Sequence, residues 1–251
     1  MSSYLPPTTI TPTYNPGSYT TDTTALTVGD ADLRYLKLVG GTETGLVSFN
    51  SGLISSTTIK NAALEPEITE LAKALVTCGA KIEGIGQTTM TIEGVDELGP
   101  LRYRVMPDRI EAGTFAAAAA ATGGKVRIDK CDPSHLESVI AALQSTGARI
   151  QTGKDDILVE GPERVDPIHV VTREYPGFPT DMQAQIIAVL CRARGTSTVK
   201  DTIYPDRFTH IPELRRLGAN IRLDGNIAVI TGVKTLEGAP VRTLEPASKL
   251  L

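Results

Sequence analysis

Residues 75–82 read LVTCGAKI, and the same pattern returns as LQSTGARI at residues 143–150 and as LRRLGANI at residues 214–221. Each copy is typical of a helix that ends at a glycine and is followed by a strand. Glycine suits the helix end because it readily adopts the left-handed cap conformation. The three glycines are Gly79, Gly147 and Gly218. A period of roughly seventy residues is too long for a solenoid repeat of two helices. The sequence therefore predicts repeated units, each of them a small fold.

The sequence around each cap predicts further strands. They are expected at residues 89–93, 157–160 and 227–231, where apolar and β-branched residues gather beside glycine-containing turns. Repeated βαβαββ units predict an α/β fold with helices on one side of a mixed sheet. After Val241, where the third unit should continue with a helix, the chain reads RTLEPASKLL. That unit is predicted to be incomplete.

Two predicted helices carry signals for their first turn. In PDRIEAGTFAAAAAA, Asp108 can cap the helix and Glu111, three residues later, can complete a capping box. In PTDMQAQIIAVLCRA, Thr180 and Gln183 stand in the same relation. The alanine run at residues 116–121 predicts a helix face that packs closely against its neighbours.

Composition and charge exclude several classes of protein. The chain has 251 residues, is 41% hydrophobic and carries a net charge of −4, so nothing draws it generally to nucleic acid or acidic membranes. No apolar run approaches the roughly 20 residues of a membrane helix, and the N-terminus has no signal-peptide pattern. Cys78, Cys131 and Cys191 form no CxxC pair, which argues against a zinc site and a disulfide scaffold and favours small core residues. We expect a cytoplasmic protein without a metal or cofactor.

The first 56 residues differ from the rest. Residues 1–24 are mostly Thr, Ser, Pro and Tyr and predict a disordered, extended arm. Residues 25–56 contain LTVGDADLRYLKLVGGTETGLVSFNSG and predict a short β module. This stretch resembles the short repeats of viral and phage fibre proteins, which implies a β-structured, often trimeric stalk. The remainder divides into a first unit at 57–130 and, at 131–251, a second unit and the truncated third.

Four motifs in order resemble one family. They are NAALEPEI (61–68), YRVMPDRIEAGTF (103–115), FPTDMQAQ (178–185) and DRFTHIPELRRLGA (206–219). Across about residues 57–241 the chain is similar to the UDP-N-acetylglucosamine 1-carboxyvinyltransferases, enolpyruvyl transferases of peptidoglycan synthesis. The resemblance implies an inside-out α/β barrel made of two domains of three units, of which this chain would hold the last unit of one domain and the first two of the other.

The resemblance also implies a reaction and a site. The enolpyruvyl group of phosphoenolpyruvate passes to the 3-hydroxyl of UDP-N-acetylglucosamine, and phosphate leaves. Asp181 would act as the base or bond the sugar hydroxyl, Arg207 would face phosphoenolpyruvate, and Ile203 would line the sugar-nucleotide site. Three charged positions match others at or near the domain interface, namely Glu65, Asp108 and Arg109.

Some family features are replaced or missing. Residues 1–56 hold no equivalent of the family's Lys-Asn pair, and no cysteine lies in the surroundings of its cysteine loop. Residues 244–246 read Leu-Glu-Pro where the family has Asp-Leu-Arg, and Tyr204-Pro205 departs from the usual aromatic-acidic pair. Since one preorganised donor is worth roughly 3 to 4 kcal/mol in catalysis, we expect an impaired or inactive transferase fragment.

Other interpretations remain open on the residues alone. The chain could be a structural, fibre-like or oligomerising protein that uses the fold as a non-catalytic body, or a chimera joined near residues 55–57. The chain could form a homo-oligomer, or a companion chain could supply the missing half. Locally, Asp181 and Thr180 could be helix caps, Arg207 a solvated surface arginine, and His210 a packing residue.

Overall fold

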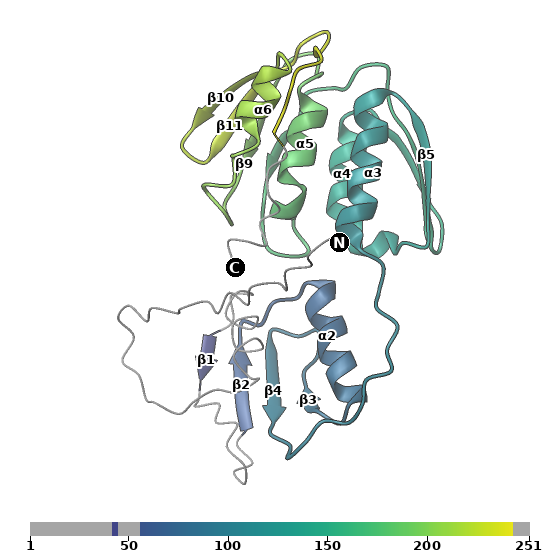
Figure 1. Ribbon diagram of the computed structural model, residues 1–251, viewed down its shortest axis with the longest axis vertical. Coiled ribbons are helices and arrows are strands. Elements are labelled where there is room, and N and C mark those ends of the chain that lie inside the picture. Colours follow the sequence, from purple (N-terminus) through teal and green to yellow (C-terminus); the bar gives the residue numbers. More distant parts are fainter. Residues whose placement is uncertain (1–41, 45–55, 243–251) are drawn as a thin grey trace, which may run out of the picture.

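The computed structural model describes residues 42–44 and 56–242. They form a lower body (residues 42–44 and 56–93) and an upper body (residues 109–242), joined by one extended segment (Figure 1). The predicted arm and nearly all of the predicted β module lie outside the described residues. Within the described part, no helix has the length and apolar character needed to cross a membrane.

The lower body is one four-stranded sheet with a single helix beside it (Figure 1). The sheet has the order β1-β2-β4-β3, with every neighbouring pair antiparallel. Its elements are β1 (Thr42–Thr44), β2 (Ser56–Lys60), α2 (Pro66–Thr77), β3 (Lys81–Glu83) and β4 (Thr89–Glu93). Ile59, Met90 and Ile68 meet in a small apolar core between sheet and helix.

The upper body contains two sheets. The first has the order β5-β7-β6 and is antiparallel, and the second has the order β10-β11-β9-β8, in which only β8 and β9 are parallel. The strands are β5 (Lys125–Asp129), β6 (Arg149–Thr152), β7 (Asp156–Glu160), β8 (His169–Val171), β9 (Thr196–Lys200), β10 (Asn220–Asp224) and β11 (Ile227–Thr231). The helices are α3 (Arg109–Thr122), η1 (Pro133–Leu136), α4 (Glu137–Ser145), η2 (Thr180–Met182), α5 (Gln183–Leu190) and α6 (Ile211–Arg216). The second sheet and its helices follow the predicted βαβαββ order, β8-α5-β9-α6-β10-β11.

Helices α3, α4 and α5 stand between the two upper sheets (Figure 1). Their close approach depends on small side chains. Ala116, Ala117, Ala119 and Ala120 of α3 are all buried, which confirms the packing predicted from the alanine run. A Cβ atom at Gly113 would lie 2.9 Å from the Met182 sulfur, so any larger residue there would force the Met182 side chain to shift.

The glycine caps and the Asp108 cap are confirmed. Gly79, Gly147 and Gly218 have φ angles of +103°, +94° and +88°, in the left-handed region that the repeat pattern requires. The Asp108 carboxylate caps α3, accepting hydrogen bonds from the backbone N–H groups of Ile110 (2.7 Å) and Glu111 (3.1 Å).

The capping role predicted for Thr180 and Gln183 is wrong. The residue before η2 is Pro179, and Thr180 is the first residue of η2 itself. The hydroxyl of Thr180 and the side-chain amide of Gln183 both donate to the carboxylate of Asp201 instead. A buried carboxylate from a neighbouring strand end therefore competes successfully with the local capping geometry.

Candidate active site

A pocket of about 90 Å³ opens where the two bodies meet. Glu65, which precedes α2, lines it from the lower body, and Arg109, the first residue of α3, lines it from the upper body. Thr180 and Asp181 of η2 and Ile203 from the loop after β9 also line it, and the segment between β8 and η2 supplies the rest, namely Arg173, Glu174, Tyr175, Gly177 and Pro179. The pocket therefore collects residues from helix starts and strand ends, as ligand sites in α/β folds commonly do.

Asp181 and Arg207, two of the predicted site residues, form an ion pair. Arg207 Nη1 lies 2.6 Å from Asp181 Oδ1, and the side chains are 31% and 48% exposed respectively. Asp181 is on η2, whereas Arg207 comes from the loop between β9 and α6. Ile203, the third predicted residue, lines the same pocket as Asp181. The structure thus brings all three together, with Arg207 joined to the pocket through Asp181.

Arg207 is held in place by more than its ion pair. Its Nη1 donates to Thr180 Oγ1 at 3.4 Å, and its guanidinium carbon lies 5.7 Å from the centre of the Tyr204 ring. Its backbone N–H donates to the Tyr204 carbonyl at 3.0 Å. Arg207 is therefore a positioned, partly buried arginine and not one that moves freely in solvent.

Arg109 joins the upper body to the lower one at the edge of the pocket. It is only 6% exposed, its Nε donates to Glu67 Oε1 of α2 at 2.7 Å, and its guanidinium lies 5.7 Å from the Tyr175 ring centre. Burial raises the pKa of the Tyr175 hydroxyl, against the opposing effect of the Arg109 charge. The resemblance placed Glu65 and Arg109 near an interface between domains, and both lie at this junction.

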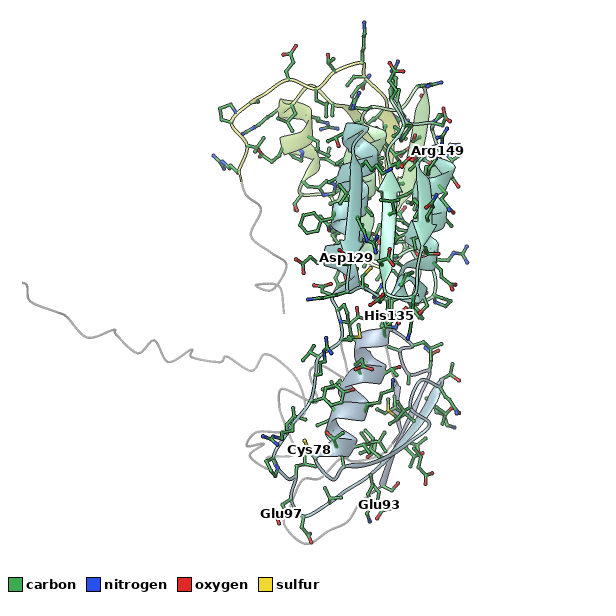
Figure 2. The ribbon with its side chains drawn as sticks, turned by 90° about the vertical axis from the view of Figure 1, so that its right-hand side faces the viewer. Cys78, Glu93, Glu97, Asp129, His135 and Arg149 are labelled. Carbon is green, nitrogen blue, oxygen red and sulfur yellow. The ribbon has the colours of Figure 1, made fainter. Side chains whose placement is uncertain are left out.

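Burial shifts the pKa of one histidine and two cysteines of the described part away from neutrality. Burial lowers the pKa of His210 to about 4, with the Arg207 charge adding to the effect, so its ring is neutral near pH 7. Burial raises the pKa of the Cys191 thiol to about 12 and also raises that of Cys131. In Figure 2, Cys78 lies within the lower body, away from the junction at which His135 is seen. No group of three or more metal-ligating side chains is found among the described residues.

Sequence reasoning missed Asp201, which is fully buried just behind the pocket. It directly follows β9, and it accepts hydrogen bonds from Thr180 and from the backbone of the loop that leads to Arg207. One signal could have pointed to Asp201. It stands at the carboxyl end of a strand that is parallel to its neighbour, and functional groups commonly gather at such strand ends. Nothing in the local sequence VKDTIY shows that this aspartate is buried.

The fold is that of the enolpyruvyl transferases. The crystal structure of the enolpyruvyl transferase NikO from Streptomyces tendae superposes with a TM-score of 0.63 over 72% of this chain and 44% of that protein, at 24% sequence identity. The sequence model of the family described as EPSP synthase (3-phosphoshikimate 1-carboxyvinyltransferase) matches residues 47–245. The chain belongs to this family of enolpyruvyl transferases.

The sequence relatives agree with the resemblance drawn from the four motifs. A UDP-N-acetylglucosamine 1-carboxyvinyltransferase of Geotalea daltonii is 48% identical over 203 residues, which are 81% of this chain and 48% of the relative. The protein of the same name from Shewanella sp. (strain ANA-3) is 51% identical over 187 residues, 74% of this chain and 44% of the relative. The chain thus spans about half the length of these curated relatives.

Proposed function

We propose that the chain carries part of the site of a UDP-N-acetylglucosamine 1-carboxyvinyltransferase and binds the sugar nucleotide at the junction of its two bodies. The observation that carries this proposal is the Asp181–Arg207 ion pair, 2.6 Å long, beside the pocket. Each partner lies in one of the motifs on which the family resemblance rests, FPTDMQAQ and DRFTH.

The pair offers the two kinds of group that the reaction needs. A carboxylate at the start of a helix can accept a hydrogen bond, and then a proton, from a sugar hydroxyl. A planar guanidinium can bind a carboxylate or phosphate with two donors at once. In the proposed complex Asp181 faces the 3-hydroxyl of the sugar, Ile203 packs against the sugar nucleotide and Arg207 faces phosphoenolpyruvate.

The proposed setting is peptidoglycan precursor synthesis in the cytoplasm. Its support is the name of the relatives, together with three cysteines that are free in the structure, as in proteins of a reducing compartment. We propose that turnover by this chain is impaired, because its sequence departs from the family at residues 204–205 and 244–246.

The test is a titration of ¹⁵N-labelled protein with UDP-N-acetylglucosamine, followed by amide chemical shifts. Saturable shifts are expected at residues around the pocket, and Asp181→Asn should weaken the affinity roughly tenfold or more. The matched control is Asp224→Asn, which removes one partner of the exposed Arg222–Asp224 pair in the same body and should leave the affinity unchanged.

Phosphate release from phosphoenolpyruvate plus the sugar nucleotide extends the test to chemistry. Release that falls by a factor on the order of 10² or more in Asp181→Asn would support a general-base role. Binding without release would limit the chain to the recognition step. The absence of any saturable shift in the wild-type protein would reject the proposed function.

A further inference from the structure

The Asp201 side chain lies behind the pocket and fixes the segments around it by hydrogen bonds. It is completely buried, at 0% exposed, although an ionised carboxylate is costly to remove from water unless hydrogen-bond donors surround it. Its backbone is also fixed, since Asp201 N–H donates to the Asn226 carbonyl at 2.9 Å and Asn226 Nδ2 donates to the Asp201 carbonyl at 2.7 Å. Both bonds tie the end of β9 to the β10–β11 turn.

One carboxylate oxygen fixes the loop that leads to Arg207. Asp201 Oδ1 accepts hydrogen bonds from the backbone N–H groups of Ile203 at 2.9 Å and Tyr204 at 2.8 Å. It also accepts one from the hydroxyl of Thr172, just beyond β8, at 2.8 Å. Tyr204 in turn provides the ring beside the Arg207 guanidinium and the carbonyl that accepts from the Arg207 N–H. The loop conformation that places Arg207 therefore depends on this oxygen.

The other oxygen fixes η2, which carries Asp181. Asp201 Oδ2 accepts from Thr180 Oγ1 at 2.7 Å and from Gln183 Nε2 at 3.2 Å. Because the Thr180 hydroxyl donates its hydrogen bond to Asp201, its lone pairs can accept from other donors, and Arg207 Nη1 supplies one at 3.4 Å. A continuous path thus runs from Asp201 through Thr180 to Arg207, whose Nη1 also bonds Asp181 at 2.6 Å.

We infer that Asp201 is a positioning residue that sets the geometry of the Asp181–Arg207 pair by fixing both of the segments that carry it. The two oxygens of one buried carboxylate hold η2 and the 203–207 loop at a set separation. That Asp181 and Arg207 then act on a sugar nucleotide and an anionic co-substrate rests on the proposed function, whereas the positioning itself does not.

The first test follows the side-chain Nε–Hε resonance of Arg207 in ¹⁵N-labelled protein, assigned by its loss in Arg207→Lys. Asp201→Asn replaces one of the two accepting oxygens with an NH2 group that donates, and Thr180→Val removes only the linking hydroxyl while keeping the shape of the side chain. In both variants the Arg207 resonance should move toward the position of an exposed arginine, and the amide signals of Ile203 and Tyr204 should move in Asp201→Asn. Thr180→Ser, which keeps the hydroxyl, should restore the wild-type position.

The matched control is Thr146→Val, which also deletes a buried hydroxyl, one that donates to the Leu143 carbonyl at 2.6 Å at the far end of α4. A residue with only a structural role would destabilise the protein without moving the Arg207 resonance, as this control should. An unmoved Arg207 resonance in folded Asp201→Asn and Thr180→Val would overturn the inference. Should Asp201→Asn fail to fold, an unmoved Arg207 resonance in folded Thr180→Val still overturns the inference.

The second test separates the inference from the proposed function. Affinity for UDP-N-acetylglucosamine should fall roughly tenfold in Asp201→Asn and remain unchanged in Thr146→Val. If the wild-type protein shows no response to the nucleotide but the Arg207 resonance moves as expected, the proposed function is rejected and the positioning role of Asp201 stands. If the nucleotide binds equally well to all variants and the Arg207 resonance does not move, the positioning role is rejected.

Discussion

The two bodies of the molecule have very unequal cores. Among the described residues, thirty buried apolar residues form the core of the upper body, and five form that of the lower body. The predicted site residues Asp181, Ile203 and Arg207 all lie on the upper body, while the lower body contributes Glu65 to the edge of the pocket. The proposed site residues therefore lie on the body whose larger core can hold buried polar groups rigidly, while the lower body adds Glu65 to the lining of the pocket.

The largest expected effect comes from removing core volume from the upper body. Leu190 of α5 is fully buried, so Leu190→Ala should lower the free energy of unfolding by about 2–5 kcal/mol through lost burial and a residual cavity. Ile68→Ala in the lower core should instead increase amide exchange in β4 and α2 and leave α5 protected. Hydrogen exchange measured on both bodies checks this, and equal loss of protection in the two bodies with either variant would show that they unfold as one.

The pH dependence of stability should arise mainly in the upper body, at His210. Its pKa is lowered from 6.5 to about 4 by burial, so between these values the unfolded chain binds a proton that the folded chain does not. The free energy of unfolding is therefore highest, as far as His210 decides it, above pH 6.5. It falls as the pH falls, by up to about 3 kcal/mol near pH 4.

Denaturant titrations from pH 7 to pH 4 measure this loss. His210→Gln should flatten the profile in that window, and His169→Gln, at an exposed histidine of β8, should not. A profile that stays equally steep in His210→Gln would show that carboxylates, and not this ring, set the acid sensitivity.

The coupling between the bodies should depend on Arg109. Arg109→Met keeps the apolar stem but removes the charge that pairs with Glu67, and the cost should be about 2 kcal/mol, between the values for buried and exposed pairs. The loss should appear as faster exchange in α2 with little change in α5. Arg127→Met is the control, because Arg127 pairs with Asp129 and Asp156 from an exposed position, and its effect should be below about 0.5 kcal/mol.

Sequence predicted the parts of this structure that are decided locally. The left-handed glycines and the Asp108 cap each depend on a few neighbouring residues, and the structure has them as expected. The four motifs predicted the family and pointed to residues that do lie together at the pocket.

Long-range contacts account for what sequence reasoning missed. Thr180 had the spacing of a cap, but a carboxylate 21 residues away binds its hydroxyl. Arg109 was placed near an interface, yet its partner Glu67 lies 42 residues earlier in the chain. The role of Asp201 depends on burial beneath three segments that only the folded chain brings together.

The smallest expected effect concerns the start of α3, where the two bodies differ again. Asp108 caps α3 with two hydrogen bonds, whereas Glu65 at the corresponding position of α2 makes no side-chain cap bond within the described part of the chain. Asp108→Ala should cost about 1 kcal/mol of unfolding free energy, and Asp108→Asn should cost only a few tenths because its side-chain oxygen can still accept. Thermal unfolding of both variants measures the difference. The cap also sets where α3 begins, and therefore where Arg109 lies. A loss of unfolding free energy in Asp108→Ala well above the value of the cap would mean that the Arg109–Glu67 contact is lost as well. The junction of the two bodies would then depend on how α3 starts.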